Sequence, residues 1–357
     1  MTEKMVIRKG RERIELSYQE FNGLRFLEMQ RALTVSQYYD YCRWLLRYEI
    51  TPYAFKNRLR KMEKFKLIRS GQFKEGFEGD HFKYVSIGSK GIDLLIEKKA
   101  LGAEYNKKQI YSFMGKSNHY HYFATKEVII RFLLHINMLV GVSKKGIFSY
   151  HYSKSPYIIH VPKATKRSIS GYGFTKRYRR RSSAPSHLQT SSTQFFLAKP
   201  DWILRFRGID VHGEKVDRVT NLELDTGTEP IWQLEAKVRK YIRVAQQFNH
   251  MQHQLLIVLP DETFLTKGKF SNRDKRIMNI LNRFEEKGLI KDAEYAGLRV
   301  DVCSLTYAPY MVQWFLWNHN MPESREPMGS YTGGYDNVLE IAKNVGLAVD
   351  DMLYSRK

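Results

Sequence analysis

The chain has 357 residues, of which 43% are hydrophobic and 13% aromatic, and its formal net charge is +22. This hydrophobic content excludes an intrinsically disordered protein, and the length suffices for two domains with sizeable cores. Two cysteines are too few for a disulfide framework or a four-thiolate zinc site. The excess of positive charge predicts an acidic partner, and double-stranded DNA is the partner we expect.

The sequence predicts a cytoplasmic protein without a membrane partner. Its best apolar stretch, VIIRFLLHINMLV, is too short to span a membrane and is interrupted by Arg131 and His135. The N-terminal stretch MTEKMVIRKGRERIEL lacks the apolar centre of a secretory signal.

Residues 22–100, which follow an N-terminal arm of residues 1–21, have the element order of a winged-helix DNA-binding domain. Helices are predicted within NGLRFLEMQRAL, VSQYYDYCRWLL and TPYAFKNRLRKMEKFKLI, and a hairpin within LIRSGQF and HFKYVSIG. The third helix of such a domain enters the major groove. The alternative is a small helical domain whose basic face is merely solvated.

The third helix has a good start and two distinct faces. Thr51 suits the N-cap and Pro52 the first helical position. Phe55, Leu59 and Met62 recur at helical spacing and predict a buried stripe. Basic residues remain on the outer face and are the predicted DNA contacts of this helix: Lys56, Arg60, Lys61 and Lys64.

After a connector at residues 101–120, helices and strands alternate up to residue 318, which is typical of a mixed-sheet α/β domain. Predicted helices lie within TKEVIIRFLLHINMLV, PIWQLEAKVRKYIRVAQQFN and NRDKRIMNILNRFEEKG. Predicted strands lie within GIFSYHYSKSPYIIHV, FFLAKPDWILRFRG, VTNLELD, HQLLIVLP and LRVDVCSL. Residues 319–357 are interpreted as a linker and a C-terminal helix.

A basic loop at residues 163–187 interrupts this domain. It contains eight Lys and Arg residues and no acidic residue. We expect it to lie along DNA and to become ordered on contact, although a solvated flexible segment would have the same composition. Its predicted phosphate contacts are Lys176, Arg177, Arg179, Arg180 and Arg181.

Three carboxylates are expected to converge where two strands end. Asp201 begins the strand in PDWILRF, and Glu223 and Asp225 end the strand in NLELD, so an antiparallel pairing would bring these ends together. Carboxylates are the ligands that Mg²⁺ or Mn²⁺ prefers, and such an ion activates water and polarises phosphate. Lys237, on the following helix, could stabilise charge on the phosphate. Strand-end carboxylates that pair with Arg205, Arg207 or Arg239 are the alternative.

PDWILRF, NLELDTGTE, the helix with Lys237 and Tyr241, and HYFATKEVIIRFLL resemble the replication-relaxation family of bacterial plasmids and mobile elements. The resemblance covers roughly residues 25–305. It implies a winged helix joined to a restriction-endonuclease-like domain of the PD-(D/E)XK type. Asp201 then resembles the motif's aspartate, Glu223 its second acid, and Glu127 the acid on the first helix, which would orient water or a second cation.

The sequence departs from this motif at Asp225, which occupies the position of the motif's lysine. Lys237 would replace that lysine from the neighbouring helix, or the site has lost cleavage and retains DNA binding alone. His121, at the start of the first helix, would cap the helix, pack there or donate to the acidic cluster.

Two histidine pairs offer rival sites. His119 and His121 have the spacing of the histidine pair in nicking enzymes that use a tyrosine, with Tyr241 as the candidate, but the pair precedes a helix instead of lying within a strand. His250 and His253 have metal-ligand spacing without an identifiable third ligand, so we interpret them as surface histidines.

These observations predict a DNA-binding protein of a bacterial mobile element with a Mg²⁺-dependent endonuclease activity that nicks DNA in replication or transfer. The alternative is a non-catalytic replication initiator or transcriptional regulator built on an inactive nuclease-like fold. A homodimer and other replication or transfer proteins are further candidate partners.

Overall fold

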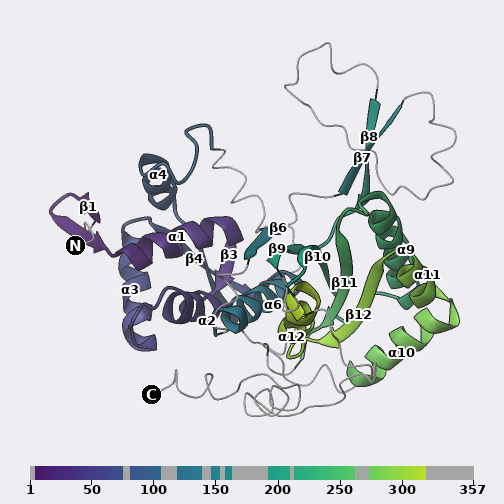
Figure 1. Ribbon diagram of the computed structural model, residues 1–357. Helices are drawn as coiled ribbons and strands as arrows, with labels where there is room; N and C mark the ends of the chain where they lie inside the picture. Colours follow the sequence, from purple (N-terminus) through teal and green to yellow (C-terminus); the bar gives the residue numbers. More distant parts are fainter. Residues whose placement is uncertain are drawn as a thin grey trace. The chain divides into compact units, whose positions relative to one another are not determined.

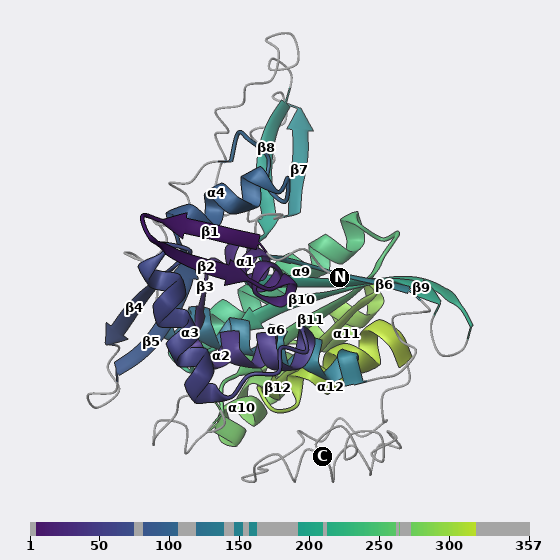
Figure 2. The same ribbon diagram turned by 90° about the vertical axis from the view of Figure 1, so that its left-hand side faces the viewer.

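A computed structural model describes residues 5–74, 81–105, 119–138, 146–152, 157–162, 192–209, 213–261, 264 and 273–318. The described residues up to Met138 form one compact unit and those from Gly146 a second, and each is considered by itself (Figures 1 and 2). The predicted basic loop 163–187 and the segment 319–357 lie outside the described residues. Among the helices that the structure describes, none has the length and apolarity needed to cross a membrane.

The first unit has the order of elements expected of a winged helix. A three-stranded sheet in the order β3-β5-β4 is antiparallel throughout, and β4 and β5 form the hairpin that follows the third helix. Its elements are α1 (Tyr18–Gln30), β3 (Ala32–Thr34), α2 (Val35–Asp40), η1 (a π-helical turn, Tyr41–Leu45), α3 (Pro52–Lys64), β4 (Ile68–Lys74), β5 (His81–Ile87) and α4 (Ser89–Glu97).

Helix α3 forms as the sequence predicts. The Thr51 side chain accepts a hydrogen bond from the Ala54 amide at 3.3 Å, and Pro52 occupies the first turn, where its missing N–H costs nothing. Phe55, Leu59 and Met62 are all buried, which leaves the opposite face of the helix exposed.

Two further elements complete this unit. A hairpin of β1 (Met5–Lys9) and β2 (Glu12–Leu16) occupies the segment that the sequence indicated only as an arm. Helix α6 (His119–Met138) packs against α2, β3 and η1. The sequence suggests a domain boundary at residue 120, whereas the compact first unit includes α6.

The second unit is built on a five-stranded mixed sheet in the order β12-β11-β10-β9-β6. β10, β11 and β12 run parallel to one another, while β9 is antiparallel to both β10 and β6. Its strands are β6 (Gly146–Tyr152), β9 (Trp202–Ile209), β10 (Lys215–Leu224), β11 (Gln252–Leu259) and β12 (Leu298–Ser304). A separate antiparallel pair consists of β7 (Tyr157–Pro162) and β8 (Ser192–Ala198).

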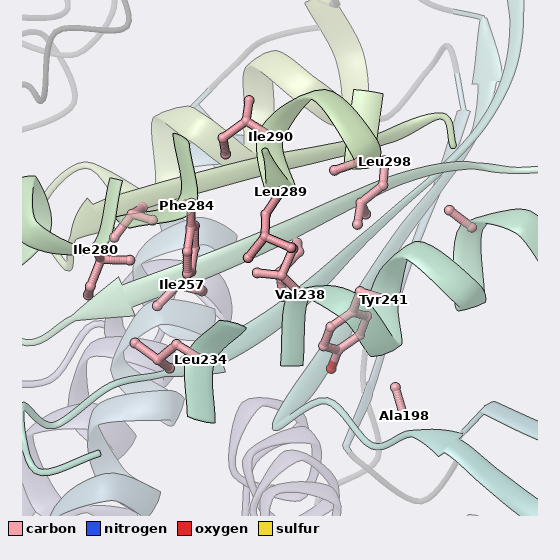
Figure 3. Packing of buried hydrophobic residues seen from close by; sticks show 14 of the residues in the cluster. Ala198, Leu234, Val238, Tyr241, Ile257, Ile280, Phe284, Leu289, Ile290 and Leu298 are labelled. Carbon is pink, nitrogen blue, oxygen red and sulfur yellow. The ribbon is translucent and has the colours of Figure 1, made fainter. Parts of the chain in front are cut away.

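Helices cover the faces of this sheet. The helices α9 (Ile231–Gln247), α10 (Arg273–Glu286) and α11 (Leu289–Tyr295) share one apolar cluster with alternate residues of the strands (Figure 3). The helix α12 (Ala308–Gln313) contacts β11 and β12, and the π-helical turn η5 (Trp314–Asn318) contacts β9 and β10. The predicted α/β architecture, with a mixed sheet and helices packed against it, is therefore confirmed.

Candidate catalytic site at the ends of β9 and β10

The strands that carry the predicted carboxylates are neighbours. β9 and β10 pair antiparallel, with Trp202 opposite Leu222, so the start of one strand meets the end of the other, as predicted. The Asp201 amide donates to the Leu222 carbonyl at 2.9 Å, and the Leu224 amide donates to Asp201 Oδ2 at 2.9 Å. These two hydrogen bonds, one between backbone groups and one to the side chain, hold the Asp201 carboxylate at the end of β10.

Glu223 is the buried centre of the site. Its side chain lies on the face of β10 that α9 covers, and only 6% of the residue is exposed. The Tyr241 hydroxyl donates to Oε1 at 2.5 Å, and the Lys237 ammonium lies 3.1 Å from Oε2. Lys237 and Tyr241 are four residues apart on α9 and therefore share one face of the helix (Figure 3 shows Tyr241 on the side of Leu234 and Val238).

This environment changes the acidity of Glu223. Burial raises the pKa of its carboxyl to about 7, and the negative charge of Asp201 acts in the same direction, while Lys237 and Tyr241 oppose the shift. The influence of Asp201 means that the two carboxylates lie within electrostatic reach of each other. Such a pair favours a cation, because a positive charge relieves both the repulsion and the cost of burial.

Lys237 connects this pair to a third acidic residue. Its ammonium lies 2.8 Å from Glu229 Oε2 as well as 3.1 Å from Glu223. Burial lowers the pKa of Lys237, but the two carboxylates outweigh that effect and raise it above its usual value. Lys237 is therefore a charged hydrogen-bond donor at neutral pH, and it cannot serve as a general base there.

Asp225 has a different partner. Its side chain is fully buried, and Arg276 on α10 binds it through two hydrogen bonds, Nε to Oδ2 at 2.6 Å and Nη2 to Oδ1 at 3.0 Å. The Gly227 amide donates to Oδ1 at 2.9 Å, and Arg276 also donates to the Glu229 carbonyl. The guanidinium thus ties together both ends of the loop between β10 and α9, and the Asp225 carboxylate is already satisfied.

The remaining side chains fit a divalent cation held by two carboxylates. Within the described ranges, no group of three or more His, Cys, Asp and Glu side chains has the arrangement of a metal site. Mg²⁺ does not require one, since it commonly keeps several waters and binds through one or two carboxylates together with substrate phosphates. Asp201 and Glu223 are the side chains that would hold it.

Two of the three arginines named as alternative partners, Arg205 and Arg207, contact a different carboxylate. Arg205 binds Asp217 through Nε at 2.6 Å and through a second, shorter contact, and Arg207 lies 3.2 Å from the same carboxylate. Asp217 belongs to the opposite end of β10 from Glu223. The positive charge that neutralises a carboxylate of the cluster comes instead from Arg276, which the sequence analysis did not identify.

Glu127 and His121 belong to the first unit, so their parts in the site stay predictions. Glu127 accepts a hydrogen bond from Gln37 Nε2 at 3.0 Å and another from Arg131 Nε at 2.9 Å. His121 lies in the first turn of α6, where its carbonyl accepts from the Thr125 hydroxyl at 2.9 Å.

The interpretation of His253 as a surface residue is wrong. It lies in β11 with 1% exposure, and its Nε2 lies 3.0 Å from the Phe248 carbonyl. Burial lowers the pKa of this imidazole. The two histidines whose spacing suggested a metal site therefore differ in setting: His250 lies in a turn, and His253 lies in a buried strand.

The predicted DNA-contacting residues of α3 all lie on its exposed face, namely Lys56, Arg60, Lys61 and Lys64. Arg60 donates to the Asn57 side chain at 3.0 Å, and Lys64 forms an ion pair with Glu12 of β2. The predicted contacts in the basic loop, from Lys176 to Arg181, lie outside the described residues.

Two comparisons with known proteins bear on the chain. A family model described as replication-relaxation matches residues 24–258, which is more than half of the chain, so the chain belongs to the replication-relaxation family. No curated protein matches it. The match ends within β11 and so includes Asp201, Glu223 and Lys237.

Proposed function

We propose that this member of the replication-relaxation family binds double-stranded DNA through its first unit and nicks it with a Mg²⁺- or Mn²⁺-dependent site in its second. The observation that carries the proposal is that Asp201 and Glu223 lie at the paired ends of β9 and β10. The Lys237 ammonium contacts the Glu223 carboxylate at this place. A family named for replication supports a role in the replication or transfer of a mobile element, and such a role places the protein in the cytoplasm.

The chemistry assigns one task to each side chain. When bound, the metal ion polarises the phosphodiester and activates water. Asp201 and Glu223 would hold that ion, and the Tyr241 hydroxyl fixes the Glu223 carboxylate in place. Lys237 carries a persistent positive charge and would stabilise the charge that develops on the phosphate. Glu127 and His121 remain candidates for orienting the water.

A plasmid assay tests this proposal. Supercoiled plasmid would be incubated with the full chain and Mg²⁺, Mn²⁺ or EDTA, beside Asp201→Ala and the matched control Asp217→Asn. We expect metal-dependent nicking that Asp201→Ala lowers by at least about 100-fold, because a lost metal ligand removes several kcal/mol of transition-state stabilisation. Asp217 forms ion pairs with Arg205 and Arg207 at the other end of the same strands, so its variant should keep the activity.

One observation favours the alternative of a non-catalytic initiator or regulator. Asp225 occupies the position of the motif's lysine and is bound by Arg276. That position therefore supplies no positive charge to the site. An intact plasmid with every metal, together with retained DNA binding by the same preparation, would establish this alternative and exclude the nuclease.

The DNA-reading part has its own test. Replacing Lys56 and Arg60 with alanine should weaken binding to the preferred sequence and reduce its discrimination from other sequences, by on the order of 10-fold per lost base contact. Lys90 of α4 and Lys98, which directly follows this helix, are exposed and provide a control double variant. Selection from a random duplex library, followed by titration of wild type and variants, measures both quantities. Equal losses on all duplexes would show that these residues contact only phosphates.

A further inference from the structure

The N-terminal hairpin has an inner and an outer face. Gly10 and Arg11 form its two-residue turn, with Gly10 at φ +60°, a conformation that glycine adopts without strain and that suits a tight hairpin. Ile14 and Leu16 on the inner face are completely buried. The tip and the outer face remain exposed, so the hairpin is anchored on one side only (Figure 2, purple).

The exposed part of the hairpin is strongly basic. Four of the six residues from 8 to 13 are Lys or Arg, and the one acidic residue, Glu12, is paired with Lys64. Arg8 stands directly opposite Arg13 in the register, so two like charges share the outer face. Such a cross-strand pair destabilises a hairpin. Glu15 relieves it weakly, since it lies 3.7 Å from Arg13 and 70% of the arginine side chain is exposed.

The hairpin is fixed to the end of α3. The Lys9 ammonium donates to the Lys64 carbonyl, at 2.9 Å, and the Lys64 ammonium pairs with Glu12 at 2.5 Å. Farther along β2, Arg58 of α3 donates to the Glu15 carbonyl while its guanidinium is paired with Glu20 of α1. The contacts of Lys64 with Lys9 and Glu12 therefore join the basic face of α3 to the hairpin.

We propose that the β1–β2 hairpin is a second DNA-binding element, whose Arg8, Arg11 and Arg13 contact the phosphate backbone of duplex DNA beside the segment bound by α3. A phosphate between Arg8 and Arg13 would offset their repulsion. The turn already holds Arg11 at the tip, so DNA binding would not cost the entropy of ordering a flexible arm. The hairpin precedes residue 24, where the match to the family begins. This inference rests on the proposed DNA binding by the first unit and is independent of the nuclease activity.

The test compares two triple variants of the full chain. One is Arg8→Gln, Arg11→Gln and Arg13→Gln. The control, Lys90→Gln, Lys98→Gln and Lys99→Gln, removes the same charge from exposed lysines in α4 and directly after it. Duplexes with and without the preferred sequence would be titrated between 50 and 200 mM salt. The hairpin variant should bind both duplexes at least about 10-fold more weakly. The negative slope of log K against log salt should become less steep by about 2 to 3, as expected for two or three lost phosphate contacts.

Each outcome decides the inference. Unchanged binding and slope in the hairpin variant, with weaker binding in the Lys56 and Arg60 variant, would overturn it and leave α3 as the DNA-binding element. A loss confined to one sequence, or a loss for single-stranded RNA or anionic vesicles without one for duplex DNA, would also overturn it. A thermal midpoint equal to or above that of wild type supports it, because removal of opposed charges should not destabilise the fold, whereas a lower midpoint would indicate a structural role.

Discussion

Glu223→Gln is expected to abolish metal-dependent nicking and, without metal, to stabilise the second unit at alkaline pH. Burial raises the pKa of Glu223 to about 7, above its usual value of 4.5. Between these values the folded chain holds a proton that the unfolded chain has released, so the stability of the wild type falls as pH rises through about 7. The glutamine does not titrate, and the variant should therefore be more stable than wild type by about 1–3 kcal/mol at pH 8.

Urea denaturation in EDTA, from pH 5 to pH 8, measures this difference. Four of the five tryptophans, Trp202, Trp232, Trp314 and Trp317, belong to the second unit, so fluorescence reports mainly on its unfolding. The control Glu286→Gln changes an acid of α10 whose side chain is 65% exposed. Its stability should follow that of wild type at every pH.

Added Mg²⁺ separates the two roles of Glu223. A cation that binds the carboxylate must displace its proton, so Mg²⁺ should stabilise the wild type more at pH 8 than at pH 6. It should not stabilise Glu223→Gln, and nicking by this variant should fall by at least about 100-fold. Equal stabilisation of both proteins by Mg²⁺ would show that Glu223 is not a metal ligand. Parallel curves of unfolding free energy against pH for the two proteins in EDTA would contradict the raised pKa of Glu223.

The pairing of Asp201 with Glu223 could be predicted from the sequence because local signals determine it. Pro200 marks the start of one strand, the strand-like stretch VTNLEL is the other, and the next helix starts after Pro230. Since two antiparallel neighbours bring opposite ends together, no long-range information beyond their adjacency was needed. Lys237 follows from the same reasoning, because it lies two turns into that helix.

The partner of Asp225 could not be predicted in this way. Arg276 lies 51 residues farther along the chain on α10, among several other basic residues of similar spacing. Which of them reaches β10 depends on how α10 packs beside α9, and amphipathic periodicity does not determine that packing. The only local signal was Gly227, two residues after Asp225, since an acid followed by glycine at this distance favours a turn closed by the acid's own side chain.

The hairpin of β1 and β2 was missed for a different reason. VIRKGRERIEL contains a glycine flanked by two short alternating stretches, which is a hairpin pattern, but its many charges favoured an arm without regular structure. The alternation of buried Ile14 and Leu16 with exposed Arg13 was the stronger signal. Similarly, His253 was interpreted as a surface residue because no third metal ligand was identifiable, whereas its position in the buried run HQLLIVL places it inside the sheet.

Breaking the Asp225–Arg276 pair is expected to cost about 3–5 kcal/mol of stability, because either single change leaves a buried charge without its partner. Asp225 is fully buried, and its loss would also remove the acceptor of the Gly227 amide. Asp225→Ala, Arg276→Met and the double variant form a cycle in which the double variant should be less destabilised than the sum of the single ones. Arg283→Met, which breaks the more exposed pair of α10 with Glu235 on α9, should cost far less stability, because solvent screens that pair.

Asp225→Asn and Arg276→Met together distinguish a structural Asp225 from a metal ligand. If Asp225 acts by holding Arg276 and the loop before α9, Mg²⁺ should still raise the stability of Asp225→Asn at pH 8, since Asp201 and Glu223 remain. A third metal ligand would behave in the opposite way: Asp225→Asn would lose the response to Mg²⁺, and Arg276→Met, which frees the carboxylate, would bind Mg²⁺ more tightly. Because the guanidinium binds both oxygens of Asp225 and the neighbouring carbonyl of Glu229, we expect the first result.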